Sequence, residues 1–519
     1  MFEFAWAMIL GTPVIAAFVF ARFPLQQALC LVVIGGYLFL PIRPSIELPA
    51  LPDINKHTLP LILGLLFCYA AARGKGWTPE KEHDWGQNTW LPRSQLGRTC
   101  LVLLLLAVPI GTYLTNRDYL PLPDDRRALG YADMGTMFYK GAMIALAVLL
   151  GRRFLSDPPG QRTLLMTLAL LGLLYCVPVL MEARLAPQTN IWVYGFNNVN
   201  WASIRRYGGF RPQVFLESGL DLAAFMATAF VAAIACVRHI RDTRRSLWLL
   251  SVMALFVGLV LMLSLGALAL GLGLGLAMFF LSRRAAMWLV AGISVFVLLY
   301  PMARVHNVVP TQTMVAAAEL VHARRADSLE FRFRQEDLIM TKAKRRPVFG
   351  WGIWSRGKTF DPVRGREVIV DSYFILIWSQ FGWAGYIAIF GLLTFPIIMI
   401  AWRREAVDPD FVTVGLAMVA CVMMLDQLIN ASSSNITWLL CGSLLGRAER
   451  GLAKAQAQDR RAAAALAKHR PRMHAIGDPV QPDGHVLARK SRTGSKRPVL
   501  AIGARDRARA ALAKRDGQT

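Results

Sequence analysis

The sequence predicts an all-α, polytopic membrane protein with about 12–14 transmembrane helices and a large, partly helical periplasmic loop. The chain has 519 residues, of which 55% are hydrophobic, and its mean hydropathy is +0.41. Apolar runs of membrane-spanning length recur from residue 4 to about residue 447. Because only helices satisfy their backbone inside lipid without closing a barrel, these runs predict helices rather than strands.

About thirteen spans are expected from these runs. The stretch 371–402 is too long for one span at about 1.5 Å per residue, so it is expected to be an interfacial helix followed by a membrane helix. The first run lacks a basic leader and is expected to stay as an anchor. The expected spans are 4–21, 26–41, 58–73, 99–115, 134–150, 163–181, 213–236, 247–263, 266–281, 287–303, 384–402, 410–429 and 434–447.

Basic residues orient these spans, because Lys and Arg gather in short cytoplasmic loops. Arginine-containing connectors recur at 152–162, 238–245, 283–284 and 403–404. They alternate correctly to share the cytoplasmic side with the loop 73–98 and the C-terminal tail. The opposite side then holds the segments 42–57, 116–133, 182–212 and 304–370.

Two organisational units are expected: a membrane domain, 1–447, and a basic cytoplasmic tail, 448–519. Within the first, the loop 304–370 carries thirteen Lys and Arg against seven Asp and Glu, and helices are expected at 311–325 and 329–346. A loop of this length lies beyond the reach of the orientation rule, so its charge is free to serve an anionic ligand.

The tail from residue 447 carries eighteen Lys and Arg against six Asp and Glu, with a helical piece around 451–468 and disorder after Pro471. It is expected either to contact anionic lipid head groups or to remain a solvated tail without a specific partner. No motif in it supports nucleic-acid binding.

Arginines are the first candidates for a binding site. Arg205, Arg206 and Arg211 stand just before the span 213–236. Guanidinium groups bind phosphate oxygens bidentately, so these three suggest a diphosphate site at the membrane surface. Interfacial anchoring is the alternative. In the large loop, Arg334 is favoured as a fourth diphosphate ligand, although a solvated helix face also explains such residues.

Carboxylates in or beside spans are the second group, since ionisable residues there are costly. Glu217 and Asp221 are four residues apart and are expected to share one helix face. They could pair with the arginines, act as a base, or carry a proton. Asp371 begins the interfacial helix, where it could cap the helix or act as a general base toward a sugar hydroxyl. The cysteines and histidines form no metal-spaced cluster, so no metal or cofactor is expected.

One block of the sequence resembles a known family. Pro347-x-x-Gly350-x-Gly352 is followed by Asp371-Ser-Tyr-Phe-x(5)-Gln380-Phe-Gly382-x-x-Gly385. This pattern resembles the O-antigen ligase and O-antigen polymerase superfamily, bacterial membrane glycosyltransferases of the GT-C type, over about residues 100–447. The sequence departs from the family at two positions, because Asp371 stands in place of a histidine and Gln380 in place of a glutamate.

The resemblance implies a bacterial inner-membrane enzyme whose donor is an undecaprenyl-diphosphate-linked glycan at the periplasmic face. It implies metal-independent transfer, with Asp371 as the base and arginines on the leaving diphosphate. The leading expectation is a polymerase of lipid-linked repeat units for O-antigen or exopolysaccharide, working with membrane lipids and other polysaccharide-assembly proteins. An O-antigen ligase or protein O-oligosaccharyltransferase is the alternative. A transporter or flippase is an alternative hypothesis from another functional class, motivated by Glu217, Asp221 and Asp426.

Overall fold

The computed structural model is mostly helical, with three two-stranded antiparallel hairpins. The chain comprises two compact units, residues 1–462 and residues 463–519. The structure describes residues 2–48, 51–74, 89–120, 127–196, 199, 201–206, 208–240, 244–321, 323–361, 365–368, 370–431 and 433–468. The tail predicted to be disordered after Pro471, and the centre of the loop 73–98, lie outside these residues.

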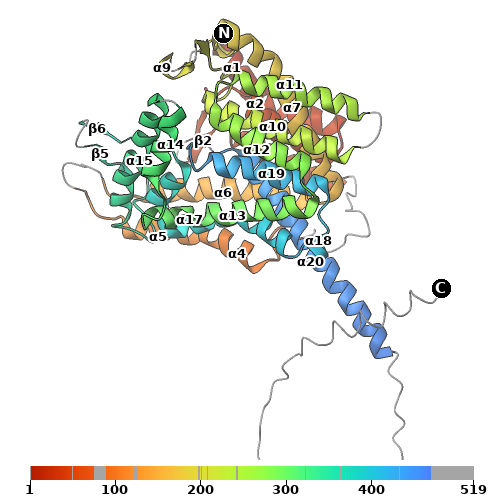
Figure 1. The fold of residues 1–519 in the computed structure, drawn as a ribbon. Helices are drawn as coiled ribbons and strands as arrows, with labels where there is room; N and C mark the ends of the chain where they lie inside the picture. Colours follow the sequence, from red (N-terminus) through yellow and green to blue (C-terminus); the bar gives the residue numbers. More distant parts are fainter. Residues whose placement is uncertain are drawn as a thin grey trace, which may run out of the picture. The chain divides into compact units, whose positions relative to one another are not determined.

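Both halves of the chain contribute helices to the bundle (Figure 1). The helices of the first half are α1 (Phe2–Arg22), α2 (Leu25–Phe39), α3 (Leu59–Gly74), α4 (Gln95–Val102), the π-helical η2 (Leu103–Ala107), α5 (Val108–Thr115), α6 (Tyr131–Phe154), α7 (Pro158–Leu185), α8 (Thr189–Tyr194), α9 (Trp201–Ile204) and α10 (Gly219–His239). Strands β1 (Ile46–Leu48) and β2 (Leu51–Ile54) form one hairpin, and β3 (Arg205–Arg206) and β4 (Gly209–Phe210) form another.

The second half adds α11 (Arg245–Leu261), α12 (Leu265–Phe280), α13 (Arg283–Val305), α14 (Thr311–Val321), α15 (Ala323–Ala343), α16 (Trp354–Gly357), α17 (Tyr373–Trp402), α18 (Arg404–Val407), α19 (Phe411–Asp426) and α20 (Asn435–Lys468). Strands β5 (Phe360–Asp361) and β6 (Arg366–Glu367) form the third hairpin. Figure 1 shows α14, α15 and this hairpin together at one side of the bundle.

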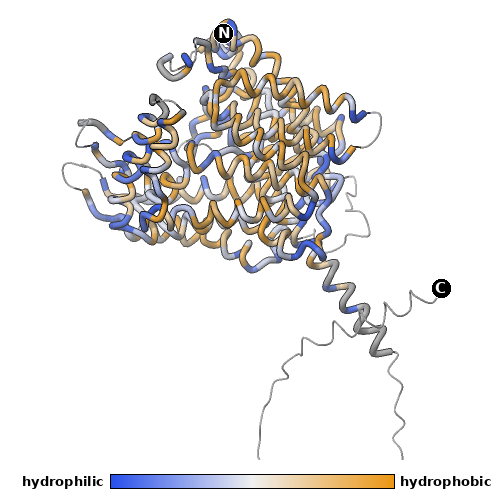
Figure 2. Tube along the Cα trace, viewed as in Figure 1, coloured by the Kyte–Doolittle hydropathy of each residue, from blue (hydrophilic) through white to orange (hydrophobic). Residues whose placement is uncertain are grey.

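Seven helical stretches are long and apolar enough to cross a membrane: α1, the continuous run α4–η2–α5, α6, α7, α10, α13 and α17. Helices α2, α3, α11, α12 and α19 are equally apolar but shorter, at 10–17 residues. Figure 2 shows a broad hydrophobic body, with hydrophilic residues gathered around α14 and α15 and again at the opposite side near α18. An apolar band between two polar ends is the distribution that a bilayer requires.

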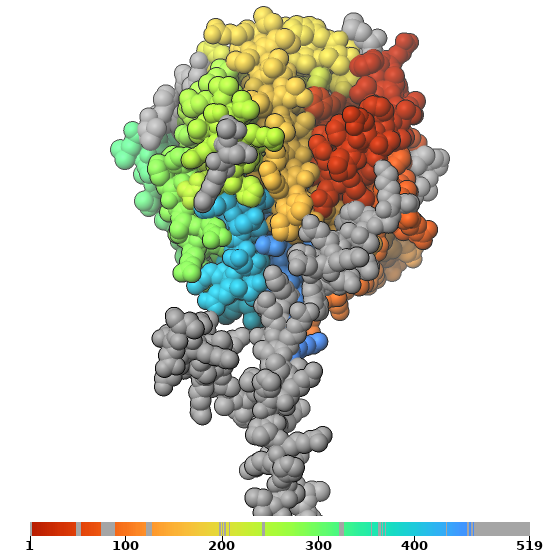
Figure 3. Space-filling view, turned by 90° about the vertical axis from the view of Figure 1, so that its right-hand side faces the viewer, coloured from red at the N-terminus to blue at the C-terminus, as the bar shows by residue number. Residues whose placement is uncertain are grey.

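Helix α10 is the centre of the core. Its alanine-rich sequence is almost wholly buried, and it packs against α7, α11, α12 and α19. Small side chains allow such close helix approach, which replaces the hydrophobic driving force that is missing in lipid. The space-filling view shows α7 as a gold band between the red N-terminal helices and the green surface of α11 and α12 (Figure 3).

Each expected span coincides with a helix. The predicted break in 371–402 is confirmed, because α17 consists of two helices joined at Gly382, whose φ is 61° and ψ −160°. The two helices expected in the large loop are confirmed as α14 and α15. The last span and the predicted helical piece of the tail are instead one helix, α20.

Two predicted helix starts were wrong. Helix α15 begins at Ala323, six residues before the expected residue 329, and α10 begins later than expected. The span expected at 213–236 begins only at Gly219, with Ser218 as its N-cap. Buried Glu182 explains this, because its carboxylate accepts the backbone N–H groups of Gln213 (2.8 Å) and Val214 (2.8 Å) and so holds that segment out of the helix. Glu217 therefore precedes the helix and does not share a helix face with Asp221.

Candidate functional site

The two halves of the glycine-containing block lie against each other. Trp351 and Gly352 donate their backbone N–H groups to the carbonyls of Ser379 (2.9 Å) and Gln380 (2.7 Å). In return, Trp383 and Ala384 donate to the carbonyls of Pro347 (2.8 Å) and Val348 (3.0 Å). The block is thus a backbone clamp that fixes the large loop to the break in α17.

Gly382 is required at that break for two reasons. Its φ of 61° lies in the left-handed region, and a Cβ placed there would collide with the carbonyls of Pro347 and Val348. The broken turn at Gly382 frees backbone groups, and the donations from Trp383 and Ala384 satisfy them. The sequence pattern that suggested the family therefore has a direct structural role in this chain.

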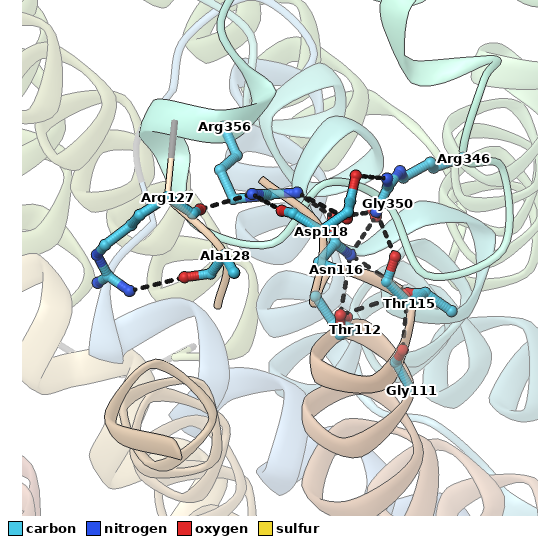
Figure 4. A network of polar contacts seen from close by, with 10 residues as sticks. All are labelled: Gly111, Thr112, Thr115, Asn116, Asp118, Arg127, Ala128, Arg346, Gly350 and Arg356. Atoms are coloured by element: carbon cyan, nitrogen blue, oxygen red, sulfur yellow. Dashed lines mark hydrogen bonds and ion pairs between the residues drawn. The ribbon is translucent and has the colours of Figure 1, made fainter. Parts of the chain in front are cut away.

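A polar network connects the same loop to the end of α5 and to the residues that follow this helix (Figure 4). Arg356 is fully buried and donates to the backbone carbonyls of Asp118 (3.0 Å) and Arg127 (2.6 Å). Arg346 donates to the carboxylate of Asp118 (2.5 Å) and to the Asn116 side-chain oxygen (2.7 Å). Two of the loop's arginines thus serve structure rather than a ligand.

Beside this scaffold lies a cavity of about 480 Å³, here called the acidic cavity. Its lining residues come from the end of α2, the turn before α3, the start of α10, the start of α17 and the segment between α19 and α20. Of these segments, the turn before α3 belongs to the segment 42–57, which was expected on the same side of the membrane as the large loop. Its polar lining residues are Tyr37, Lys56, His57, Glu217, Ser218, Asp221, Asp371, Tyr373, Asn430 and Ser433.

Three carboxylates face this cavity, and all three were predicted as site residues. Glu217 accepts a hydrogen bond from His57 Nε2 at 2.7 Å, and this bond lowers the pKa of the carboxyl although burial opposes it. Asp221 lies in the first turn of α10, where it accepts from the Ser218 hydroxyl at 2.7 Å. Asp371 pairs with Arg332 at 3.4 Å. Asp371 does not cap α17, because Ser372 occupies the N-cap position.

Lys56 is the cation of the acidic cavity. It is 1% exposed, and its ammonium donates to the carbonyl of Phe215 at 2.9 Å. Burial lowers the pKa of Lys56 to about 8, although Glu217 and Asp221 oppose that shift. The lysine therefore remains mostly protonated at neutral pH and partly offsets the three carboxylates.

The four predicted diphosphate ligands lie elsewhere. Arg205 and Arg206 are exposed on β3. Arg211 is buried, packs its stem against Gly219, and donates to the Leu263 carbonyl at 3.3 Å. Arg334 is partly exposed and pairs with buried Asp361 at 3.2 Å. None of the four is among the described residues that line the acidic cavity, so the structure does not bring them together there.

A second, larger cavity of about 700 Å³ adjoins the first and is here called the apolar cavity. It lies between the η2 region, α6, α17 and α20, and most of its lining is aliphatic or aromatic. Lys140, Asp53 and Gln380 are polar residues on its wall. The two cavities share three residues: His57, Tyr373 and Ser433.

Sequence reasoning missed Lys56, His57, Tyr37 and Ser433 as cavity residues. The one available signal was the Lys56–His57 pair directly before an apolar run, on the side assigned to the large loop. Among the described residues, no group of three or more His, Cys, Asp or Glu side chains is arranged to hold a metal ion.

No protein-family model matches the chain, and no curated protein is significantly similar to it.

Proposed function

We propose that this protein is a bacterial inner-membrane glycosyltransferase of the O-antigen ligase and polymerase type. In this proposal it polymerises undecaprenyl-diphosphate-linked repeat units at the periplasmic face, with about 12–14 spans and a cytoplasmic tail. The observation that carries it is the pair of adjoining cavities, one acidic and one apolar. A ligand with a sugar head and a long polyprenyl tail needs both environments side by side.

The chemistry follows from that arrangement. The polyprenyl tail of the donor occupies the apolar cavity, so the sugar–phosphate bond lies near the shared residues His57, Tyr373 and Ser433, where the acidic cavity begins. An acceptor hydroxyl must lose a proton as it attacks the anomeric carbon. Asp371 faces the acidic cavity and keeps the predicted role of base. Arg205, Arg206, Arg211 and Arg334, the predicted diphosphate ligands, line neither cavity, so among the described lining residues of the apolar cavity Lys140 is the cation that can bind the diphosphate.

The proposal is tested with purified protein in detergent, without a membrane gradient. A lipid-diphosphate-linked repeat unit is supplied, and its consumption and the length of the product are measured. Growth of long glycan chains is expected from the wild-type protein. Asp371→Asn is expected to lower the rate by about 10²-fold or more if the carboxylate is the base. Absence of any donor turnover by the wild-type protein would contradict the proposal.

A ligase differs from a polymerase only in its acceptor. In a deletion strain, loss of a polymerase leaves short glycans on the final acceptor, whereas loss of a ligase leaves polymer on the lipid carrier. The product in that strain therefore separates the two readings.

One observation favours the transporter reading. A small cavity continues from the acidic cavity into the bundle and is lined by Asp221, Gln427 and Thr437. Such a polar inlet toward the membrane interior suits a proton or ion path. Donor turnover without any gradient excludes a protein that is only a transporter.

A further inference from the structure

Counted with His57 neutral, the acidic cavity carries a net negative charge. Its lining holds three carboxylates, Glu217, Asp221 and Asp371, against the single ammonium of Lys56. Arg332, which pairs with Asp371 at 3.4 Å, does not reverse this balance when it is counted as well. Each additional anion in a partly buried site is disfavoured by the carboxylates already there. The cavity is therefore a poor site for a diphosphate and for any other acidic group.

We infer that the acidic cavity is the subsite for the acceptor saccharide, and that this saccharide is neutral or amino-substituted. The inference rests on the proposed glycosyl transfer and specifies its acceptor. The negative charge of the cavity discriminates between three chemical classes of sugar, because it attracts an ammonium, tolerates a neutral sugar and repels a carboxylate.

Hydrogen-bonding capacity supports the same ligand. Ionised carboxylates only accept hydrogen bonds, whereas sugar hydroxyls and ammonium groups donate them. The small inlet at the base of the cavity shares Tyr37 and Asp221 with it and adds Gln427. Gln427 is 2% exposed, and within the described part of the chain its side-chain oxygen has no hydrogen-bond partner. Such an acceptor is costly to leave unpaired, so it calls for a donor from the cavity.

The side chains of the cavity wall also suit a saccharide. Tyr37 and Tyr373 both line the acidic cavity, and aromatic rings bind the apolar faces of sugars while carboxylates bind their edges. Glu217 is held by His57 at 2.7 Å, and Asp221 by the Ser218 hydroxyl at 2.7 Å. Two of the three carboxylates are therefore positioned before the ligand arrives, which lowers the entropic cost of binding.

The position of the cavity agrees with an acceptor role. Because His57, Tyr373 and Ser433 belong to both cavities, a saccharide in the acidic cavity lies next to whatever head group extends from the apolar one. The negative charge keeps the donor's diphosphate out of the acidic cavity while leaving the acceptor hydroxyls beside the donor sugar. The two substrates are thereby sorted by charge.

The test measures binding by the full-length protein in detergent, by saturation-transfer NMR, with methyl glycosides of glucose, glucosamine and glucuronic acid as probes. The three differ mainly in charge. The amino and neutral glycosides are expected to bind, and the glucuronide is expected to bind at least tenfold more weakly.

Glu217→Gln and Asp221→Asn are expected to weaken binding of the glucosaminide at least fivefold and to reduce the discrimination against the glucuronide. Glu330→Gln, which changes an exposed glutamate on α15, is the matched control and leaves all three affinities unchanged.

Equal binding of the glucuronide, or unchanged binding in both carboxamide variants, would overturn the inference. Melting temperatures of the variants show whether each remains folded, and each variant is informative without the other.

The same experiments distinguish failure of the acceptor assignment from failure of the proposed function. Donor turnover without charge selectivity rejects only the acceptor assignment, whereas selective glycoside binding without donor turnover rejects the enzymatic proposal.

Discussion

Arg356 illustrates how a buried arginine can be entirely structural. Its guanidinium donates to two backbone carbonyls, those of Asp118 and Arg127, and has no solvent exposure. Replacement by Met leaves these acceptors unpaired in a buried place. We expect Arg356→Met to lower the free energy of unfolding by about 3 kcal/mol, because several charge-assisted bonds are lost together. Denaturant unfolding of the purified protein measures this.

Exposed Arg345 provides the control for that variant. It lies in the same loop, and Arg345→Met is expected to change stability by less than about 0.5 kcal/mol. Equal stabilities for the two variants would show that the network of Figure 4 contributes little to folding.

The same network predicts a pH dependence. Burial raises the pKa of Asp118, but the hydrogen bond from Arg346 and the charges of Arg346 and Arg356 outweigh it, so the pKa lies below its ordinary value of 3.8. A lowered folded-state pKa gives stability that is full above the ordinary value and is lost as the pH falls through the folded-state value. The difference in melting temperature between wild type and Asp118→Asn should therefore shrink on acidification below about pH 4. A constant difference across that range would contradict the assignment.

Individual residues also show what sequence could predict of the site. Glu217, Asp221 and Asp371 were singled out because carboxylates beside membrane spans are costly, and all three reach one cavity. Lys56 and His57 were missed, since their partners Phe215 and Glu217 lie about 160 positions away in the chain. A hydropathy pattern shows that a charged residue beside a span is energetically costly. It does not show which distant residue pairs with that charge.

At the scale of an element, the break in α17 carries the next prediction. Ala at position 382 would have both an unfavourable φ and a collision with the carbonyls of Pro347 and Val348. Gly365 has the same φ of 61° with open space around its Cα, so Gly365→Ala measures the backbone cost alone. We expect about 1 kcal/mol for Gly365→Ala and at least about 2 kcal/mol more for Gly382→Ala. Similar losses in thermal unfolding would mean that the clamp yields easily to a methyl group.

Helices were predicted better than their ends. Length and hydropathy located each span, and the excess length of 371–402 indicated the break in α17, because these signals are local. The start of α10 was misplaced by six residues, since the cause is Glu182 on α7, which accepts the N–H groups of Gln213 and Val214. A helix boundary fixed by a tertiary hydrogen bond leaves no trace in the segment's own composition.

At the scale of the whole membrane unit, polar contacts separate into two groups at opposite ends of the same helices. Helix α6 begins beside Arg127, which pairs with Asp133, and ends at Arg152, which pairs with buried Glu449 at 2.7 Å. Helix α20 begins beside His57 and reaches Glu449. The acidic cavity lies with the first group, and α18 lies at the end of α17 away from it. The alternating basic connectors predict two such faces and assign the second group to the cytoplasmic one.

A labelling experiment tests that separation across a real membrane. All seven native cysteines are buried, so introduced cysteines can be followed without first removing them. Glu330→Cys places a thiol on exposed α15, and Glu405→Cys places one on exposed α18. In intact spheroplasts, a membrane-impermeant maleimide should modify the cysteine at position 330 and leave that at 405 unmodified until the membrane is permeabilised. The wild-type protein, as control, should remain unlabelled under both conditions. Modification of both positions in intact spheroplasts would place the large loop and α18 on one face, and would remove the periplasmic cavity on which the proposed reaction depends.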